Sequence, residues 1–314
     1  MRSPDGRAHA PSDRILLIAP SWVGDAILSE PLIAQLRRSC VEQPIDVIVP
    51  PWGGPVYARM RCVGRIIDNP AAHRQVALRA RRALGRSLRE NRYTHAYVLP
   101  NTWKSALVPF FADIRNRIGY VGEARFGLLT EARKLDRKAL PQLVARYAAL
   151  ATADGALIDA TPAPQLVPKP ENLRAAMHAL RLSNARPVAI LCPGAEFGPA
   201  KRWPAEYFAA LAQRLSDDGH AIWILGSPND RAVAAALIEA QSSPIPGVID
   251  LTGRTDLGPS IDLMSVASLV VSKCPGLLHA AAAVNLPPVA LFGPPAPPSP
   301  PPLPPTPPPA APPP

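Results

Sequence analysis

The chain is poor in cysteine and aromatic residues and has no long hydrophobic run. Its cysteines, Cys40, Cys62, Cys192 and Cys274, form no C-x-x-C pair and have no histidine at ligand spacing. We therefore expect neither a zinc site nor a disulfide framework, and a reduced cytoplasmic setting. No segment reaches the roughly 20 apolar residues that cross a bilayer, and the apolar run 15–19 is too short for a signal sequence.

Acidic residues are scarce in the first half only. Residues 1–150 hold 24 Lys and Arg against 12 Asp and Glu, whereas the chain of 314 residues has 34 against 24. Because clustered positive charge concentrates anions, we expect an acidic partner for that half, such as nucleic acid, anionic lipid or phosphorylated glycan. The alternative is a set of ordinary solvated cations. Nucleic acid is disfavoured, since aromatics make up only 5% of the chain and stacking on bases requires them.

Strand and helix patterns alternate along the chain, which is typical of α/β proteins. The expected strands are 14–19, 45–49, 96–99, 187–191 and 221–225, and the expected helices are 29–38, 76–90 and 205–217. We expect Ser29 to cap the helix 29–38, with Pro31 in its first turn. Two doubly wound, Rossmann-like halves would face each other across a cleft at the carboxyl ends of their strands.

Proline marks the expected domain boundaries. Four prolines in 158–170 predict a linker between an N-terminal domain, 14–157, and a C-terminal domain, 171–293. Residues 1–13 are expected to be a disordered lead. In 294–314, 15 of 21 residues are proline, which predicts an extended polyproline tail without a core and an incomplete second domain. Such a tail could bind proline-recognising modules or could result from a frameshift.

The first candidate motif is SWVGD, residues 21–25, expected between the first strand and the first helix. Gly24 permits close approach of the backbone, and the Asp25 carboxylate could accept a proton from a sugar hydroxyl. Asp25 could instead cap the helix, because aspartate is a preferred N-cap residue.

The second motif is CPGAEFGPAKRWP, residues 192–204, between an expected strand and helix. Its glycines, the cations Lys201 and Arg202, and the helix N-terminus together suit a diphosphate. A solvated loop with incidental cations is the alternative. Two weaker signals follow: Asp230 could accept hydrogen bonds from a ribose diol, and Gly276 could form a turn before an alanine-rich helix, where His279 is more simply a packed residue.

Together these motifs resemble glycosyltransferase family 9, and within it the lipopolysaccharide heptosyltransferases of type II. The similarity runs from about residue 15 to 293 and includes SWVGD, CPGAEFGPAKRWP, GLLHAAAAV and the stretches 97–114 and 117–129. It implies a two-domain GT-B fold and an inverting, metal-independent transfer of heptose from ADP-heptose to the first heptose of the inner core. The chain would be a monomer in the cytoplasm, or peripheral on the inner face of the cytoplasmic membrane, where an acidic lipid A core acts as acceptor.

The resemblance also assigns residues. Asp25 would be the general base, and Lys201 would contact the donor diphosphate. The donor site would comprise Gly24, Gly194, Glu196, Phe197, Gly198, Lys201, Arg202, Ser227, Asp230, Gly276, Leu278 and His279. The acceptor site would comprise Asn101, Lys104, Arg115, Arg117 and Arg125.

The chain departs from the family pattern in two places. Relatives have N-D-S-G where this chain has Lys273, Cys274, Pro275 and Gly276, and Pro275 removes a backbone donor. Relatives also continue after the second domain with helices, where this chain has the proline tail. The alternative function is therefore an impaired homologue that only binds sugar nucleotide or acidic glycan.

Overall fold

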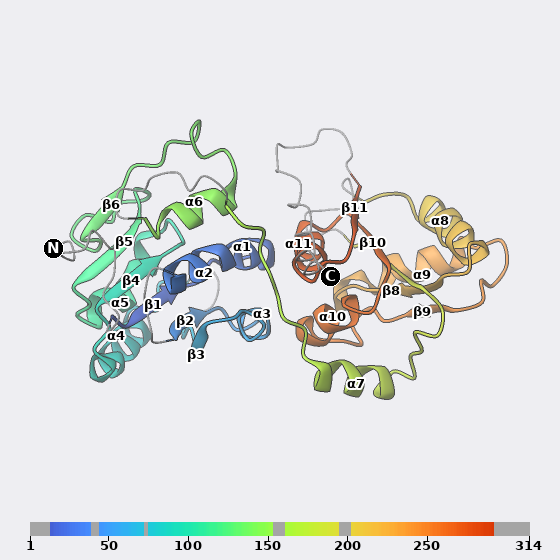
Figure 1. The fold of residues 1–314 in the computed structure, drawn as a ribbon, viewed down its shortest axis with the longest axis horizontal. Coiled ribbons are helices and arrows are strands. Elements are labelled where there is room, and N and C mark those ends of the chain that lie inside the picture. The colour runs from blue at the N-terminus through green and yellow to red at the C-terminus, as the bar shows by residue number, and fades with distance from the viewer. Residues whose placement is uncertain (1–12, 39–43, 72–74, 153–160, 195–201, 292–314) are drawn as a thin grey trace, which may run out of the picture. The chain divides into compact units, whose positions relative to one another are not determined.

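The computed structural model describes residues 13–38, 44–71, 75–152, 161–194 and 202–291 (Figure 1). The chain forms two compact units, which divide between Pro164 and Gln165. Each unit contains one parallel sheet with helices on its faces, and this confirms the expected α/β class. Within the described ranges, no helix has the length and apolar character that a membrane span requires.

Unit 1 contains a six-stranded parallel sheet. Its strands are β1 (Ile15–Ile18), β2 (Ile45–Val49), β3 (Val63–Asp68), β4 (His95–Val98), β5 (Asn116–Tyr120) and β6 (Glu131–Arg133). They lie in the order β3-β2-β1-β4-β5-β6, which is the strand order of Rossmann folds. The chain builds outward from β1 on one side and then on the other. This change of direction lies between β1 and β4, and open α/β sheets bind ligands at the carboxyl ends of such strands.

Helices cover both faces of the first sheet. They are α1 (Val23–Leu28), α2 (Glu30–Arg38), α3 (Gly54–Tyr57), α4 (Leu78–Ser87), α5 (Leu107–Phe111) and α6 (Leu143–Ala149). Helix α1 packs against α2, α3 and α6, whereas α4 packs against α5. The second contact is close because Gly85 has no side chain, and a Cβ there would lie 2.5 Å from the Cβ of Phe111. Buried Leu16, Ile18 and Val98 form the core with these helices.

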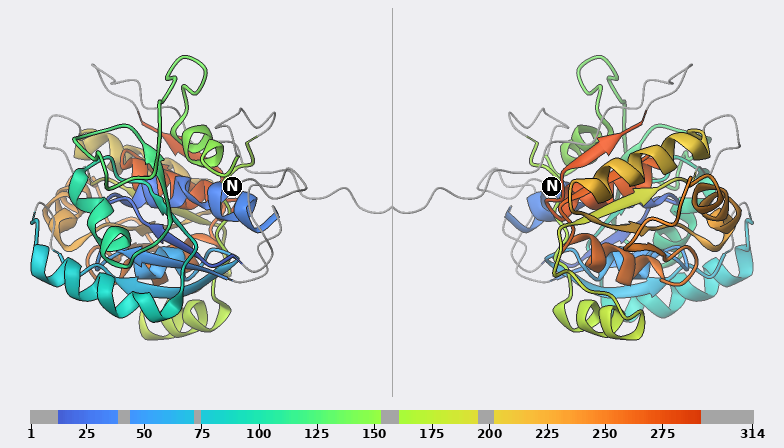
Figure 2. Two further views of the ribbon diagram at one scale, coloured as in Figure 1. Left: turned by 90° about the vertical axis from the view of Figure 1, so that its left-hand side faces the viewer. Right: turned by 90° about the vertical axis from the view of Figure 1, so that its right-hand side faces the viewer.

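Unit 2 repeats this plan with five parallel strands. They are β7 (Val188–Cys192), β8 (Ala221–Ile224), β9 (Val248–Asp250), β10 (Leu269–Ser272) and β11 (Pro288–Ala290), in the order β11-β10-β7-β8-β9. The helices are α7 (Pro170–Ala179), α8 (Ala205–Asp217), α9 (Arg231–Glu239), α10 (Leu257–Met264) and α11 (Pro275–Ala283). Helices α8 and α9 contribute Phe208, Ala212 and Leu237 to the buried core of this unit. Helix α8 is the yellow helix in the right-hand view of Figure 2. The change of direction lies between β7 and β10.

The expected strands are confirmed, and 45–49 and 205–217 agree with β2 and α8 residue for residue. The helix expected over 76–90 is α4 followed by a 3-10 turn, Leu88–Asn91. Two local predictions are wrong. Ser29 precedes α2 but does not cap it: its angles, φ −83° and ψ −11°, are helical, it is the C-cap of α1, and its Oγ bonds the carbonyl oxygen of Ala26 and the hydroxyl of Tyr57. Gly276 lies within the first turn of α11 rather than in a turn before it.

Candidate functional site

Asp25 lies at the carboxyl end of β1, beside the change of direction in unit 1. Helix α1 already begins at Val23 and its N-cap is Trp22, so Asp25 lies in the first helical turn and the capping alternative is wrong. Gly24 precedes it in the same turn. Both residues are half-buried. Burial raises the pKa of the Asp25 carboxyl, which makes its carboxylate a stronger proton acceptor.

Two buried tyrosines lie near Asp25. Tyr57 ends α3 and Tyr147 belongs to α6, and both helices pack against α1. Burial raises the pKa of each phenol, and the charge of Asp25 raises both further. No local sequence pattern points to these tyrosines, because only the packing of three helices brings them to Asp25.

Arg125, expected to bind the acceptor, has a buried guanidinium that donates to backbone carbonyls. It bonds the carbonyl oxygens of Pro100, at 2.7 Å, and of Tyr120, and it lies 3.4 Å from Oδ1 of Asn101. The residue is 4% exposed. Arg125 thus joins the loops that follow β4 and β5, and the alternative of an ordinary surface cation does not describe it.

Arg117 makes the same kind of contact. Its guanidinium donates to the carbonyl oxygens of Leu128, at 2.6 Å, and Ile114, at 2.5 Å, and lies over the ring of Phe110. The other predicted acceptor residues differ in exposure. Asn101 and Arg115 are exposed, and Lys104 is half-buried in a 3-10 turn after β4.

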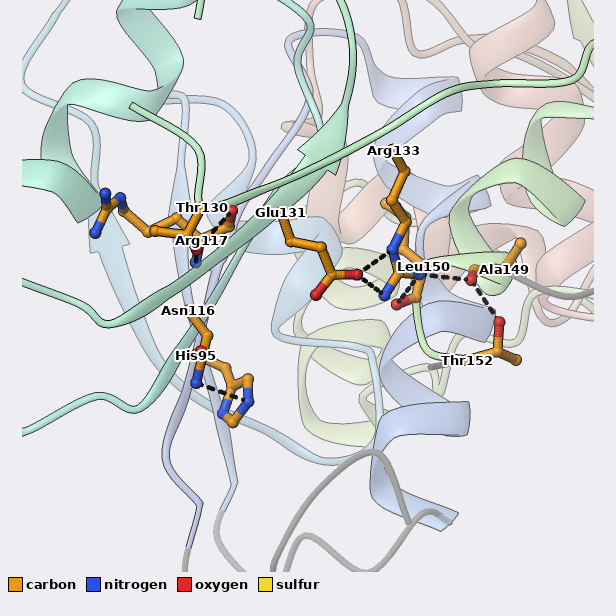
Figure 3. A network of polar contacts seen from close by, with 9 residues as sticks. All are labelled: His95, Asn116, Arg117, Thr130, Glu131, Arg133, Ala149, Leu150 and Thr152. Carbon is orange, nitrogen blue, oxygen red and sulfur yellow. Dashed lines mark hydrogen bonds and ion pairs between the residues drawn. The ribbon is translucent and has the colours of Figure 1, made fainter. Parts of the chain in front are cut away.

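A further arginine fixes the helix that carries Tyr147 (Figure 3). Arg133 ends β6 and forms an ion pair with Glu131, with 2.5 Å between Nη2 and Oε1. Its Nη1 donates to the carbonyl oxygens of Ala149 and Leu150, both at 3.1 Å. The C-terminus of α6 is therefore tied to the edge of the first sheet.

In unit 2, the loops that follow β7 and β8 meet at Gly194. A Cβ on Gly194 would overlap the carboxylate of Asp230, so only glycine fits there. Oδ2 of Asp230 accepts hydrogen bonds from the backbone N and the Oγ of Ser227, both at 2.8 Å. The bond from the backbone N of Ser227 is one half of a capping box, in which the Ser227 side chain also accepts from the backbone N of Asp230, and this box fixes the loop after β8. The structure therefore brings together Gly194, Ser227 and Asp230.

Of the remaining predicted donor residues, some lie outside the described residues and the others differ in exposure. Lys201, Glu196, Phe197 and Gly198 lie outside the described residues. Arg202 is exposed before α8, Leu278 is buried, and His279 is half-buried on α11, where burial lowers its pKa to about 4. Pro275 occupies the first position of α11, where a backbone N–H has no partner within the helix. The donor that this proline removes is therefore not one that the helix uses.

Among the described residues, no group of three or more His, Cys, Asp or Glu side chains could hold a metal ion. The polar groups at the two sheet edges instead suit hydrogen bonding and proton transfer. The fold and these residues define an α/β protein of two Rossmann-like units, each with polar side chains gathered at the carboxyl ends of its strands.

Comparison with known proteins then identifies the family. The profile of "Glycosyltransferase family 9 (heptosyltransferase)" matches residues 81–306. The chain is 42% identical over 291 residues to lipopolysaccharide heptosyltransferase 2 of Escherichia coli K12, covering 90% of this chain and 84% of the relative. It is 41% identical to lipooligosaccharide heptosyltransferase 2 of Haemophilus influenzae, with the same coverage. The chain therefore belongs to glycosyltransferase family 9.

The solved structures agree. The structure of E. coli ADP-heptose LPS heptosyltransferase II matches with a TM-score of 0.83 and 40% identity, over 93% of this chain and 88% of that chain. The resemblance found in the sequence and the two-domain fold that it implied are thus confirmed.

Proposed function

We propose that this protein transfers heptose from ADP-heptose to the heptose of a lipopolysaccharide core acceptor. The observation that carries the proposal is the 42% identity over 90% of the chain to lipopolysaccharide heptosyltransferase 2. The site is compatible with this proposal, since Asp25, a half-buried carboxylate of raised pKa, lies at the carboxyl end of β1 in unit 1. Unit 1 would bind the acceptor, unit 2 the ADP-sugar, and the protein would act as a monomer at the inner face of the cytoplasmic membrane.

In the proposed reaction Asp25 takes the proton of the acceptor hydroxyl. The hydroxyl oxygen attacks the anomeric carbon of the heptose, and the bond from that carbon to the diphosphate oxygen breaks. ADP leaves with the bonding electron pair, and one displacement inverts the anomeric carbon. Lys201 and Arg202 would stabilise the negative charge on the departing diphosphate, and Asp230 would lie near the ribose.

The roles of the predicted acceptor residues divide by the bonds that their side chains make. Arg117 and Arg125 donate to backbone carbonyls, so we propose that they shape the acceptor loops. Asn101 and Arg115 are exposed and Lys104 is half-buried, and we propose that these three residues contact the acceptor directly.

Replacing Asp25 by Asn tests the proposal. The amide cannot accept the proton, so the transfer rate should fall by about a hundredfold to ten-thousandfold. ADP binding should be unchanged, because Asp25 belongs to the acceptor unit. The assay measures the release of ADP after the purified chain is mixed with ADP-heptose and a lipid A core that bears one heptose.

Asp218→Asn is the matched control, since Asp218 is an exposed acid in unit 2, and it should transfer at the rate of the unmodified chain. Binding of ADP without any transfer by the unmodified chain would instead support an impaired homologue. Full transfer by Asp25→Asn would remove Asp25 from the role of base.

A further inference from the structure

Helix α1 and its C-cap carry two polar side chains one turn apart, Asp25 and Ser29. Residues four apart lie on the same face of a helix, with roughly 5–6 Å between their Cβ atoms. Ser29 is fully buried. Its Oγ lies 2.6 Å from the carbonyl oxygen of Ala26 and 2.9 Å from the hydroxyl of Tyr57.

The direction of these two bonds follows from the number of protons. A carbonyl oxygen only accepts, so Ser29 must donate its single hydroxyl proton to Ala26. The Tyr57 hydroxyl must then donate to Ser29. In this bond the proton of the Tyr57 hydroxyl points to Ser29. The charge of the Asp25 carboxylate also acts on the same phenol.

A phenol that donates to a carboxylate stabilises the charged form and weakens it as a base. We infer that Ser29 is a positioning residue for the reaction: by accepting the Tyr57 proton it keeps that donor away from Asp25 and preserves the basicity of the carboxylate. This inference rests on the proposed role of Asp25 as general base.

Other groups on the helices around α1 are engaged differently. Tyr147 of α6 is buried and is influenced by the charges of Asp25, Tyr57 and Arg146. Arg146 donates to the carbonyl oxygens of Leu140 and Pro141, and Arg59, after α3, donates to that of Pro55. Glu30 of α2 is buried. Tyr57 is thus the phenol that bonds Ser29 and also experiences the charge of Asp25.

The test is Ser29→Ala in the full chain. The alanine cannot accept, so the Tyr57 hydroxyl is free to donate to Asp25 and to lower the pKa of its carboxyl. The acid limb of the kcat/KM profile should move to lower pH by about one unit, which is 1.36 kcal/mol. The value of kcat at neutral pH should fall by about threefold to tenfold, and the KM for ADP-heptose should not change.

A double variant isolates the cause. Tyr57→Phe removes the same hydroxyl without freeing it, so Ser29→Ala combined with Tyr57→Phe should return the acid limb to its original pH. Ser29→Cys is the second single variant, because the thiol fills the site and is a weak acceptor; it should shift the limb in the same direction. The inference would be overturned if the acid side of the pH profile stayed in place in both Ser29→Ala and Ser29→Cys. It would also be overturned if the double variant showed the same shift as Ser29→Ala.

Titration of the Asp25 carboxyl by carbon-13 NMR separates this inference from the proposed function. Asp25→Asn assigns the signal. If the pKa of the Asp25 carboxyl falls in Ser29→Ala but the pH profile of kcat/KM does not move, the hydrogen-bond geometry is supported. Asp25 is then excluded as the base, and the positioning role of Ser29 is overturned. A pKa unaltered in Ser29→Ala would overturn the geometry itself.

Discussion

The two units share one topology, but different contacts fix the loops at the carboxyl ends of their strands. In unit 1, arginine side chains donate to backbone carbonyls and thereby join loops, as Arg125 and Arg117 do after β4 and β5. In unit 2, the loops after β7 and β8 are fixed by the approach of Gly194 to Asp230 and by the capping box of Ser227. Long arginine side chains therefore fix the loops of unit 1, whereas short polar contacts fix those of unit 2.

This difference changes how the charge excess of residues 1–150 is understood. The excess predicted an acidic partner, but several arginines of unit 1 direct their guanidinium groups to the protein's own carbonyls. They are Arg59, Arg81, Arg89, Arg117, Arg125, Arg133 and Arg146. Each keeps its charge and can still contribute to the field of the unit. Regional charge therefore does not identify which cations meet a ligand, because arginine is also a structural donor to loops.

The largest effect is expected for Arg125→Met. The change leaves the half-buried carbonyl of Pro100 and the buried carbonyl of Tyr120 without their donor, which should lower the free energy of unfolding of unit 1 by about 3 kcal/mol. Chemical denaturation followed by circular dichroism measures it. Arg115→Met is the control, since exposed Arg115 should cost less than about 0.5 kcal/mol. An intact stability together with a raised KM for the acceptor would instead make Arg125 a direct ligand-binding residue.

A smaller effect is expected for Gly194→Ala in unit 2. The new Cβ would overlap the Asp230 carboxylate and push apart the loops after β7 and β8. We expect ADP to bind at least about tenfold more weakly, or about 1.4 kcal/mol, as measured by titration calorimetry. Gly54→Ala is the control, because a Cβ there meets its nearest neighbour, Cγ2 of Ile66, at 3.8 Å. Unchanged ADP affinity would show that the contact of these two loops is not part of the donor site.

The smallest effect concerns pH. An unfolded histidine has a pKa near 6.5, whereas burial lowers that of His279 to about 4. Between these values the unfolded chain binds more protons, so the stability of unit 2 is complete above about pH 6.5 and is lost as the pH falls toward 4. His279→Asn should flatten that slope, by on the order of 1 kcal/mol per pH unit between about pH 6 and 4, in denaturation curves at several pH values.

His178→Asn on the exposed face of α7 is the control for this measurement and should keep the slope. In unit 1, burial also lowers the pKa of His95, and the nearby Asp13 and Glu131 oppose the shift. A slope that survives His279→Asn would assign the acid sensitivity to His95 and unit 1.

Local pattern was sufficient for most of the fold. Continuous apolar runs predicted the buried strands, and the periodicity of 205–217 predicted α8 residue for residue. Prediction failed where a short helix precedes another, as at α1 and α2. There the alternation of apolar residues continues across Ser29, so that sequence periodicity does not mark the end of the first helix.

The sequence by itself determined the family, the α/β class and the candidate base Asp25, because these depend on local motifs and on periodicity. Only the tertiary structure decided that the hydroxyl of Ser29 lies within hydrogen-bond distance of that of Tyr57, and that Arg125 bonds Pro100. The physical reason is that these partners lie 28 and 25 residues apart, and only the order of the strands and the packing of the helices brings them together.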